Sequence, residues 1–108
     1  MYDTKEIIES FSKKVSGTIG YNLFMAECGL QGEEVKKLKG INGGYEIIES
    51  DKQGIYRAIY TLETKDYVIV LHAFQKKSKK GGEVPKKDRE LTEKRIKEAR
   101  AWAKEQKL

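Results

Sequence analysis

Cations and one histidine gather in a short stretch of this chain, from Gly54 to Lys77. Arg57 lies within an apolar and aromatic run, and the only histidine, His72, is followed closely by Lys76 and then Lys77. Cations held at the ends of rigid strands suit a polyanion better than a neutral metabolite. The stretch therefore indicates chemistry on phosphate groups.

Cutting RNA without a metal ion requires three actions: activation of a 2′-hydroxyl, stabilisation of a charged phosphorane, and protonation of the leaving 5′-oxygen. Arg and Lys side chains can supply the electrostatic stabilisation. His, Lys, Glu or Tyr can transfer the protons if their pKa values are suitably shifted. Residues of these types lie on the predicted strands or at their ends, namely Arg57, His72, Lys76, Lys77, Glu46 and Tyr60.

The elements that must position these side chains follow from apolar spacing and turn residues. We expect a first helix that starts at Asp3 or Thr4 and breaks near Ser16-Gly17, and a second helix that ends at Gly29 to Gly32. Three strands should follow at 45–49, 55–62 and 67–75, and a last helix should run from Pro85 to about Lys107. Short turns between the strands predict an antiparallel meander. The predicted class is α+β: a small antiparallel sheet of three or four strands packed against two N-terminal helices, with a C-terminal helix, in one domain over residues 1–108.

Three local predictions complete this picture. The second helix should bury Ile19, Leu23, Phe24 and Cys28, and the charged segment from Val35 to Leu38 should form a connector or one helical turn. Alternation along the last strand should place one set of side chains on one face: Val68, Val70, His72, Phe74 and Lys76. The other face should then hold Ile69, Leu71, Ala73, Gln75 and Lys77. On this basis His72 and Lys76 can act together, whereas the face of Arg57 relative to them cannot be read.

Composition narrows the function classes. The net charge is +5, and the segment from Lys76 to Arg89 carries an excess of the same size, which favours an acidic partner. A single cysteine excludes a disulfide within the chain and points to a reducing compartment, so we expect a cytoplasmic protein. The apolar runs are too short to span a bilayer. One His and one Cys, far apart, exclude a zinc site, and neither a P-loop nor a nucleophile elbow is found, so we expect no metal and no cofactor.

Four motifs, in order, resemble the RelE/HigB group of toxins, in particular its phage-derived branch. They begin with Gly44-Tyr45-Glu46-Ile47-Ile48 and Tyr56-Arg57-Ala58-Ile59-Tyr60. They continue with Leu71-His72-Ala73-Phe74-Gln75-Lys76-Lys77-Ser78 and a helix that opens at Pro85-Lys86-Lys87-Asp88, with Arg95 near the arginine of the family's last helix. The resemblance covers roughly residues 38 to 100.

The resemblance implies a type II toxin that cuts messenger RNA on the ribosome without a metal ion, and a cognate antitoxin, often a helix-turn-helix protein. By position, it implies that Arg57, Lys76 and Lys77 stabilise the scissile phosphate and that His72 acts as an acid, a base or an orienting group. Lys79, Lys80 and Tyr60 are then the expected substrate-binding residues. Arg57 could also form a structural ion pair with Glu46 or Glu49, and Glu46 is expected to orient Arg57 rather than to act as a base.

The chain departs from the family pattern at three places. Ile48 stands where relatives often have arginine, the basic loop before Pro85 is longer, and the chain starts on a helix where many relatives start on a strand. A non-catalytic protein of this fold, which binds RNA or the ribosome or poisons DNA gyrase, is therefore the alternative. A domain whose charge serves only solubility is the third reading.

Overall fold

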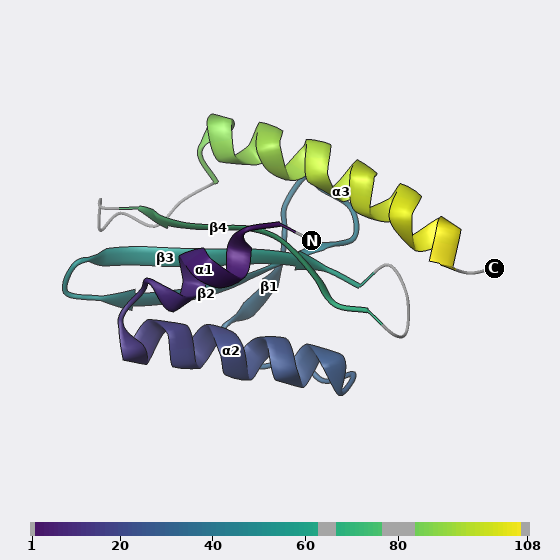
Figure 1. The fold of residues 1–108 in the computed structure, drawn as a ribbon. Coiled ribbons are helices and arrows are strands. Elements are labelled where there is room, and N and C mark those ends of the chain that lie inside the picture. The colour runs from purple at the N-terminus through teal and green to yellow at the C-terminus, as the bar shows by residue number, and fades with distance from the viewer. Residues whose placement is uncertain (1, 63–66, 77–83, 107–108) are drawn as a thin grey trace.

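The computed structural model describes residues 2–62, 67–76 and 84–106. Its elements, labelled in Figure 1, are α1 (Thr4–Glu9), α2 (Lys13–Glu27), β1 (Val35–Lys37), β2 (Gly44–Asp51), β3 (Gly54–Thr61), β4 (Ile69–Lys76) and α3 (Lys86–Gln106). The predicted α+β class is confirmed, and the sheet has four strands, the larger of the two expected numbers. No helix in these described ranges combines the length and the apolar character that crossing a bilayer requires.

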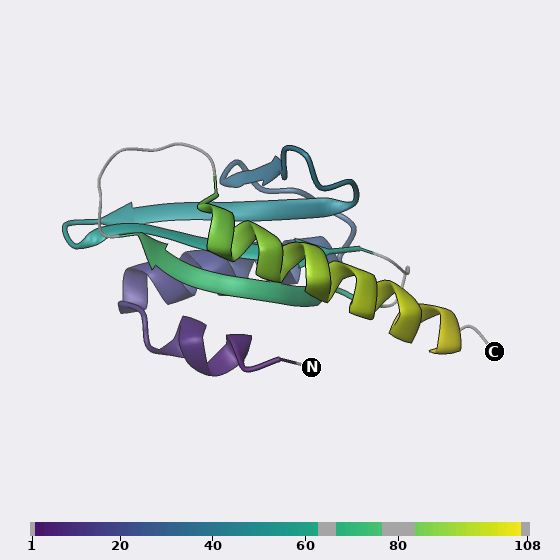
Figure 2. The ribbon, with the colours of Figure 1, turned by 90° about the horizontal axis from the view of Figure 1, so that it is seen from above.

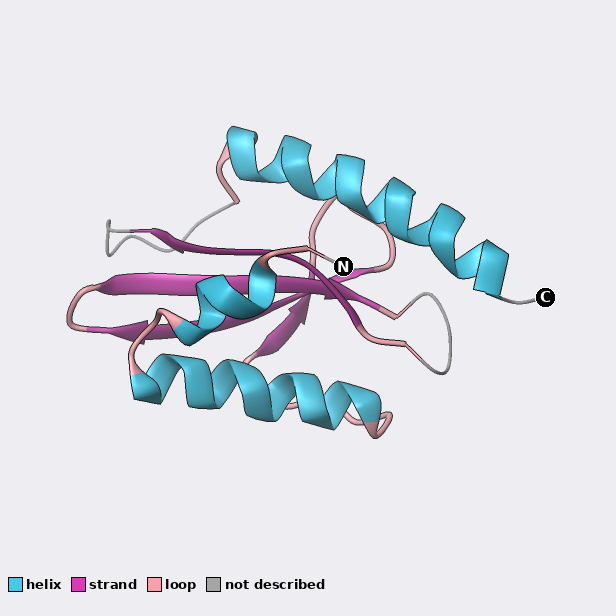
Figure 3. Ribbon diagram, in the orientation of Figure 1, coloured by secondary structure: helices cyan, strands magenta, loops and turns pink. Residues whose placement is uncertain are grey.

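The four strands form one antiparallel sheet in the order β1-β2-β3-β4, so the predicted meander is confirmed. Gly40 and Gly43, both with positive φ, shape the turn between β1 and β2. Helices cover both faces: α1 and α2 lie on one side of the sheet and α3 on the other (Figures 1 and 3). The molecule therefore has three layers, with the sheet in the middle.

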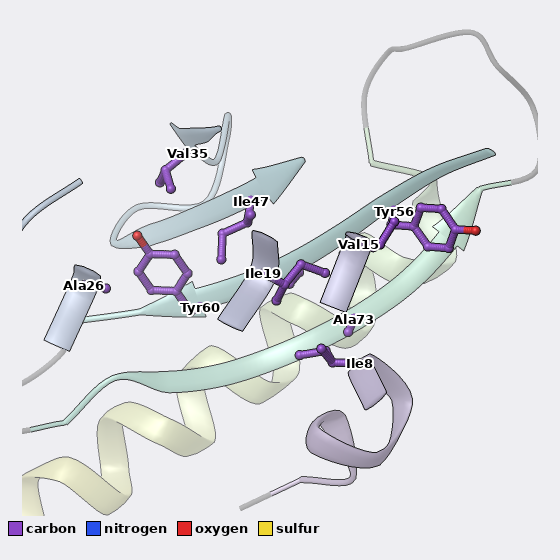
Figure 4. Packing of buried hydrophobic residues seen from close by; sticks show 10 residues of the cluster. Ile8, Val15, Ile19, Ala26, Val35, Ile47, Tyr56, Tyr60 and Ala73 are labelled. Atoms are coloured by element: carbon purple, nitrogen blue, oxygen red, sulfur yellow. The ribbon is translucent and has the colours of Figure 1, made fainter. Parts of the chain in front are cut away.

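The core between the sheet and the first two helices holds side chains from both layers (Figure 4). Val15 and Ile19, one helical turn apart on α2, are fully buried against Ile47 of β2 and the alternating Tyr56 and Tyr60 of β3. A second core on the other face joins β3 and β4 to α3 and contains Ile59, Leu71, Ile96 and Ala99. Because both faces of β3 are covered, its residues are almost continuously buried.

A bulge interrupts the alternation of β4. Ile59 of β3 pairs with His72, but the next residue, Tyr60, pairs with Val70, so Leu71 is an extra residue in β4. Leu71 and His72 therefore both face α3, whereas Val70 faces α1 and α2. The predicted common face for Val70 and His72 is wrong, because simple alternation does not hold across a bulge.

The break between the first two helices is also misplaced in the sequence-based prediction. The chain leaves helical structure at Ser10 to Ser12, and α2 then runs without interruption through Gly17. Ser12 caps α2, since its Oγ accepts a hydrogen bond from the Val15 amide at 3.3 Å. Gly17 does not end the helix because neighbouring apolar residues anchor it to the sheet.

Two further local predictions are wrong. The segment from Val35 to Lys37 is an edge strand, not a helical turn, because it pairs with β2 across the turn at Gly40 to Gly43. Phe24, at 60% exposure, and Cys28 lie on the exposed side of α2 and its end. Of the other two residues predicted to be buried, Ile19 is buried and Leu23 packs half-buried against the core. The buried side of α2 also includes Val15, Asn22 and Ala26. Gly29, with φ of 78°, follows the helix as expected.

Candidate functional site

The sheet face beneath α3 carries the candidate cations. On this face Arg57 of β3 lies between Ile48 of β2 and Phe74 of β4, its direct cross-strand neighbours. His72 and Lys76 flank Phe74 at two-residue spacing and so share the face of Arg57. Diagonal cross-strand neighbours lie about 7–8 Å apart, within reach of long side chains. The tertiary structure thus brings Arg57, His72 and Lys76 together.

Arg57 is a buried cation held by a carboxylate. Its Nη1 lies 3.4 Å from Oε2 of Glu46, a diagonal neighbour on β2, and the two side chains are only 3% and 11% exposed. Of the two carboxylates expected as partners of Arg57, Glu46 is the one that pairs with it, whereas Glu49 accepts a hydrogen bond from Thr18. Burial raises the pKa of Glu46, and the charges of Arg57 and Lys36 oppose this rise without cancelling it. A buried charge of this kind requires its partner, so the pair fixes where the guanidinium group lies.

Lys36 is a member of this face that sequence reasoning missed. It pairs across β1 and β2 with Glu46, and its charge acts on the Glu46 carboxyl. Glu46 therefore lies between two cations, Lys36 and Arg57. The signal in the sequence was the apolar Val35 followed by the charged Lys36. In the structure Val35 is buried and Lys36 is exposed, as in an edge strand that pairs with β2.

His72 is held by a second carboxylate. Its Nε2 lies 2.7 Å from Oδ1 of Asp88, a residue of the first turn of α3. The ring also stacks on Phe74, with centroids 5.1 Å apart. When Nε2–H donates to Asp88, Nδ1 carries the free lone pair, and this buried atom has no hydrogen-bond partner. In this arrangement Nδ1 is the ring atom that remains able to accept a proton.

The remaining candidates fall into three groups. Lys76, the last residue of β4, is half-buried on the face of Arg57, whereas Lys77, Lys79 and Lys80 lie outside the described residues. Tyr60 lies on the opposite face, 2% exposed and stacked on Tyr45 with centroids 5.4 Å apart. Burial, and then the neighbouring Tyr45, raise the pKa of Tyr60. The sheet itself separates the Tyr60 phenol from Arg57.

This face offers electrostatic and proton-transfer chemistry. Arg57, Lys36 and Lys76 can stabilise anionic oxygens, while His72 and Glu46 can exchange protons. Asp88 was missed as the partner of His72, although it belongs to the quoted motif that opens the last helix. Among the described residues, no three side chains of the metal-binding types His, Cys, Asp and Glu are grouped to hold a metal ion.

A family sequence model, described as phage-derived protein Gp49-like (DUF891), matches residues 6–97. The matched segment runs from α1 to the second half of α3 and includes every strand. This family belongs to the superfamily of RelE/HigB-like toxin–antitoxin proteins, which agrees with the phage-derived branch that the motifs indicated. A search of curated proteins found no match, and neither did a search of solved structures.

Proposed function

We propose, since this chain belongs to the family of Gp49-like phage-derived proteins, that it is the toxin of a type II toxin–antitoxin system and cuts messenger RNA on the ribosome. The observation that carries the proposal is the common face of Arg57, His72 and Lys76 beneath the start of α3. Two of these side chains are each held by a carboxylate, which pre-organises them for a substrate.

In the proposed reaction the 2′-oxygen of the RNA attacks phosphorus, and the bond from phosphorus to the 5′-oxygen breaks. The products are a 2′,3′-cyclic phosphate and a 5′-hydroxyl. One group takes the proton from the 2′-hydroxyl, and another gives a proton to the 5′-oxygen. Arg57 and Lys76 stabilise the charge that builds up on the non-bridging oxygens. His72, oriented by Asp88, is the proposed group for one of these two proton transfers.

The ion pair between Glu46 and Arg57 controls access to the guanidinium group in this scheme. An arriving phosphate competes with the Glu46 carboxylate for Arg57. Because burial raises the pKa of Glu46, its protonation, which releases Arg57, is easier than for an exposed carboxyl. Glu46 is thus a positioning residue in the free protein.

A non-catalytic toxin or RNA-binding protein is the second candidate, and one observation favours it. Ile48, which replaces an arginine frequent in relatives, lies directly opposite Arg57, so an apolar side chain occupies a central position of the face. A protein that binds the ribosome or RNA, or that poisons DNA gyrase, does not need that cation.

The test is primer extension on a reporter messenger RNA after brief induction of the chain. We expect new 5′ ends within the translated region for the native chain, and loss of these ends for Arg57→Ala and Lys76→Ala. Lys52→Ala, in the turn between β2 and β3, is the matched control and should cut as the native chain does. Growth arrest with intact messenger RNA would contradict the proposed nuclease activity. A DNA-damage response would then favour a toxin that poisons DNA gyrase.

A further inference from the structure

The last helix, α3, covers only part of its face of the sheet. In its first turn Asp88 contacts His72 of β4. Near its other end Trp102 meets Tyr67, which precedes β4, with ring centroids 5.0 Å apart. The helix therefore runs away from Phe74, the next residue of this face after His72. Figures 1 and 2 both show the hairpin of β2 and β3 extending past the start of α3.

Three apolar side chains are left partly exposed at this hairpin end of the face. Ile48 and Phe74 are the direct neighbours of Arg57 on either side, and Ile55 precedes Arg57 by two residues on β3. By contrast Ile59, two residues further along β3, is fully buried in the core beneath α3. Adjacent strands lie about 4.8 Å apart, so this surface is roughly 10 Å wide. We call Ile48, Ile55 and Phe74 the apolar platform.

Phe74 gives the platform an aromatic ring in a fixed position. The ring stacks with that of His72, with centroids 5.1 Å apart and an angle of 22° between the planes, and it packs against the core beneath α3. Part of its surface nevertheless stays exposed. A ring that is already held loses little conformational freedom when a planar ligand binds, and nucleobases of every kind stack on such rings.

Cations border the platform on two sides. Lys76 lies directly opposite Ile55 and two residues after Phe74. On the other side the guanidinium group of Arg57 reaches toward Glu46, its partner in the ion pair. A ligand on the platform therefore has a positive side chain near each border. Planar apolar rings joined by negative groups, as in a single strand of nucleic acid, match this arrangement.

The carboxylates near the platform do not cancel these cations. Among the described residues of the hairpin, Glu49 and Asp51 lie on the other face, toward α2. Glu49 accepts a hydrogen bond of 2.9 Å from Thr18, and Asp51 accepts one of 3.1 Å from Ser12. On the face of the platform, the two carboxylates of the candidate site are paired with the arginine and with the histidine ring. The open surface beside the platform therefore favours an anionic ligand.

We propose that the apolar platform holds an unpaired nucleobase of the RNA, next to the phosphate that Arg57 and Lys76 bind. This inference rests on the proposed function, which supplies RNA as the ligand and these two cations as its phosphate contacts. Because stacking tolerates every base, the platform positions the strand and does not select a sequence. Ile48, at the place where relatives often have arginine, is then part of the binding surface.

The test measures binding of the whole chain to two short ligands at low salt. One is pentauridylate with 2′-O-methyl groups, which cannot be cut because the attacking hydroxyl is blocked. The other is the matching chain of tetrahydrofuran spacers, which keeps the phosphates and lacks the bases. We expect the native chain to bind pentauridylate about tenfold more tightly than the spacer chain. Lys76→Met should weaken binding of both ligands by the same factor, because a phosphate contact does not depend on the base.

Substitutions at Phe74 separate stacking from packing. Phe74→Leu keeps an apolar side chain and removes the ring, so the preference for pentauridylate should fall to less than about threefold. Phe74→Tyr keeps the ring and should retain the preference. Phe24→Leu is the matched control, because it makes the same change at an exposed position of α2 across the sheet, and it should bind as the native chain does. Thermal unfolding of each variant checks that the fold is intact.

Methyl NMR shows where the base lies. The methyl signals of Ile48 and Ile55 should shift with pentauridylate and not with the spacer chain, since only a base has a ring current. The signals of Ile69, buried at the other end of β4, should stay in place with both ligands.

The outcomes distinguish the platform from the nuclease. A full preference for pentauridylate in Phe74→Leu, or base-dependent shifts away from Ile48 and Ile55, would overturn the platform. Absence of binding at low salt would also overturn it, even if primer extension shows cleavage. Binding with the expected base effects but without cleavage would support the platform and contradict the nuclease. Self-association of the chain that Phe74→Leu removes would assign the platform to a second copy instead.

Discussion

Asp88 of α3 and His72 of β4 meet through a contact of 2.7 Å between Oδ1 and Nε2. This contact ties the first turn of the last helix to the strand that also carries Lys76. The ring of His72 is fixed on its other side by stacking on Phe74, the cross-strand neighbour of Arg57. The start of α3 therefore helps to define the candidate catalytic face.

Replacing Asp88 with Asn should lower stability and the proposed activity together. The amide loses the charge that orients the histidine, and we expect a loss of about 1 kcal/mol in the free energy of unfolding. Urea denaturation would measure this loss, and primer extension would measure the activity. Glu90→Gln is the matched control, because its pair with Lys86 is 3.9 Å long and exposed, and such pairs contribute little. Equal behaviour of the two variants would refute an orienting role for Asp88.

The pair between Arg57 and Glu46 should show strong coupling in a double-mutant cycle. Arg57→Met leaves a buried carboxylate without its main cation, and we expect a loss of about 3 kcal/mol. Adding Glu46→Gln should restore more than half of this loss, because the remaining side chain is neutral. Lys36→Met, a change at an exposed cation beside the same carboxylate, should alter stability by less than about 0.5 kcal/mol. Additive effects of the two buried changes would contradict the coupling.

The carboxyl group of Glu46 should titrate above the ordinary value of 4.5. Burial is the main cause, and Arg57 lowers the pKa, so the titration midpoint should rise further in Arg57→Met. Because the pKa is higher in the folded state, Glu46 favours folding at low pH, and this contribution is lost as the pH rises through the folded pKa. Carbon-detected NMR of the Glu46 side chain would measure both midpoints. A midpoint at or below 4.5 in the native chain would contradict the burial argument.

Tyr2 should keep its proton well into the alkaline range. Burial first, and then a hydrogen bond of 2.8 Å from the phenol to Glu98, raise its pKa from 10.0 to about 12. Since the folded pKa is the higher one, the stabilisation is present below about pH 10 and is lost as the pH rises through the folded value. The difference in phenolate absorbance between the native chain and Tyr2→Phe would give this pKa.

Glu98→Gln should lower the pKa of Tyr2, because the carboxylate is one of the groups that raise it. Glu105→Gln removes the same charge from an exposed position on the same helix and should leave the titration of Tyr2 unchanged. If both variants shift the Tyr2 titration equally, the specific bond to Glu98 is not the cause.

Local patterns were enough to predict most elements and the sheet order. The turn residues around Gly40 to Gly44 and the short connections between apolar runs predicted the meander, and the ordered motifs pointed to the phage-derived family. A carboxylate of the neighbouring strand, Glu46 or Glu49, was also expected as the partner of Arg57. These features depend on neighbours in the sequence or on strands joined by short turns, for which local spacing carries the information.

Only the tertiary structure decided which side chains meet on the candidate face. The bulge at Leu71 turns His72 toward α3, β1 brings Lys36 to Glu46, and the start of α3 brings Asp88 to His72. Each of these relationships depends on the register between strands or on packing between elements. A shift of one residue changes the face of every side chain that follows, and the spacing of a single strand does not contain that information.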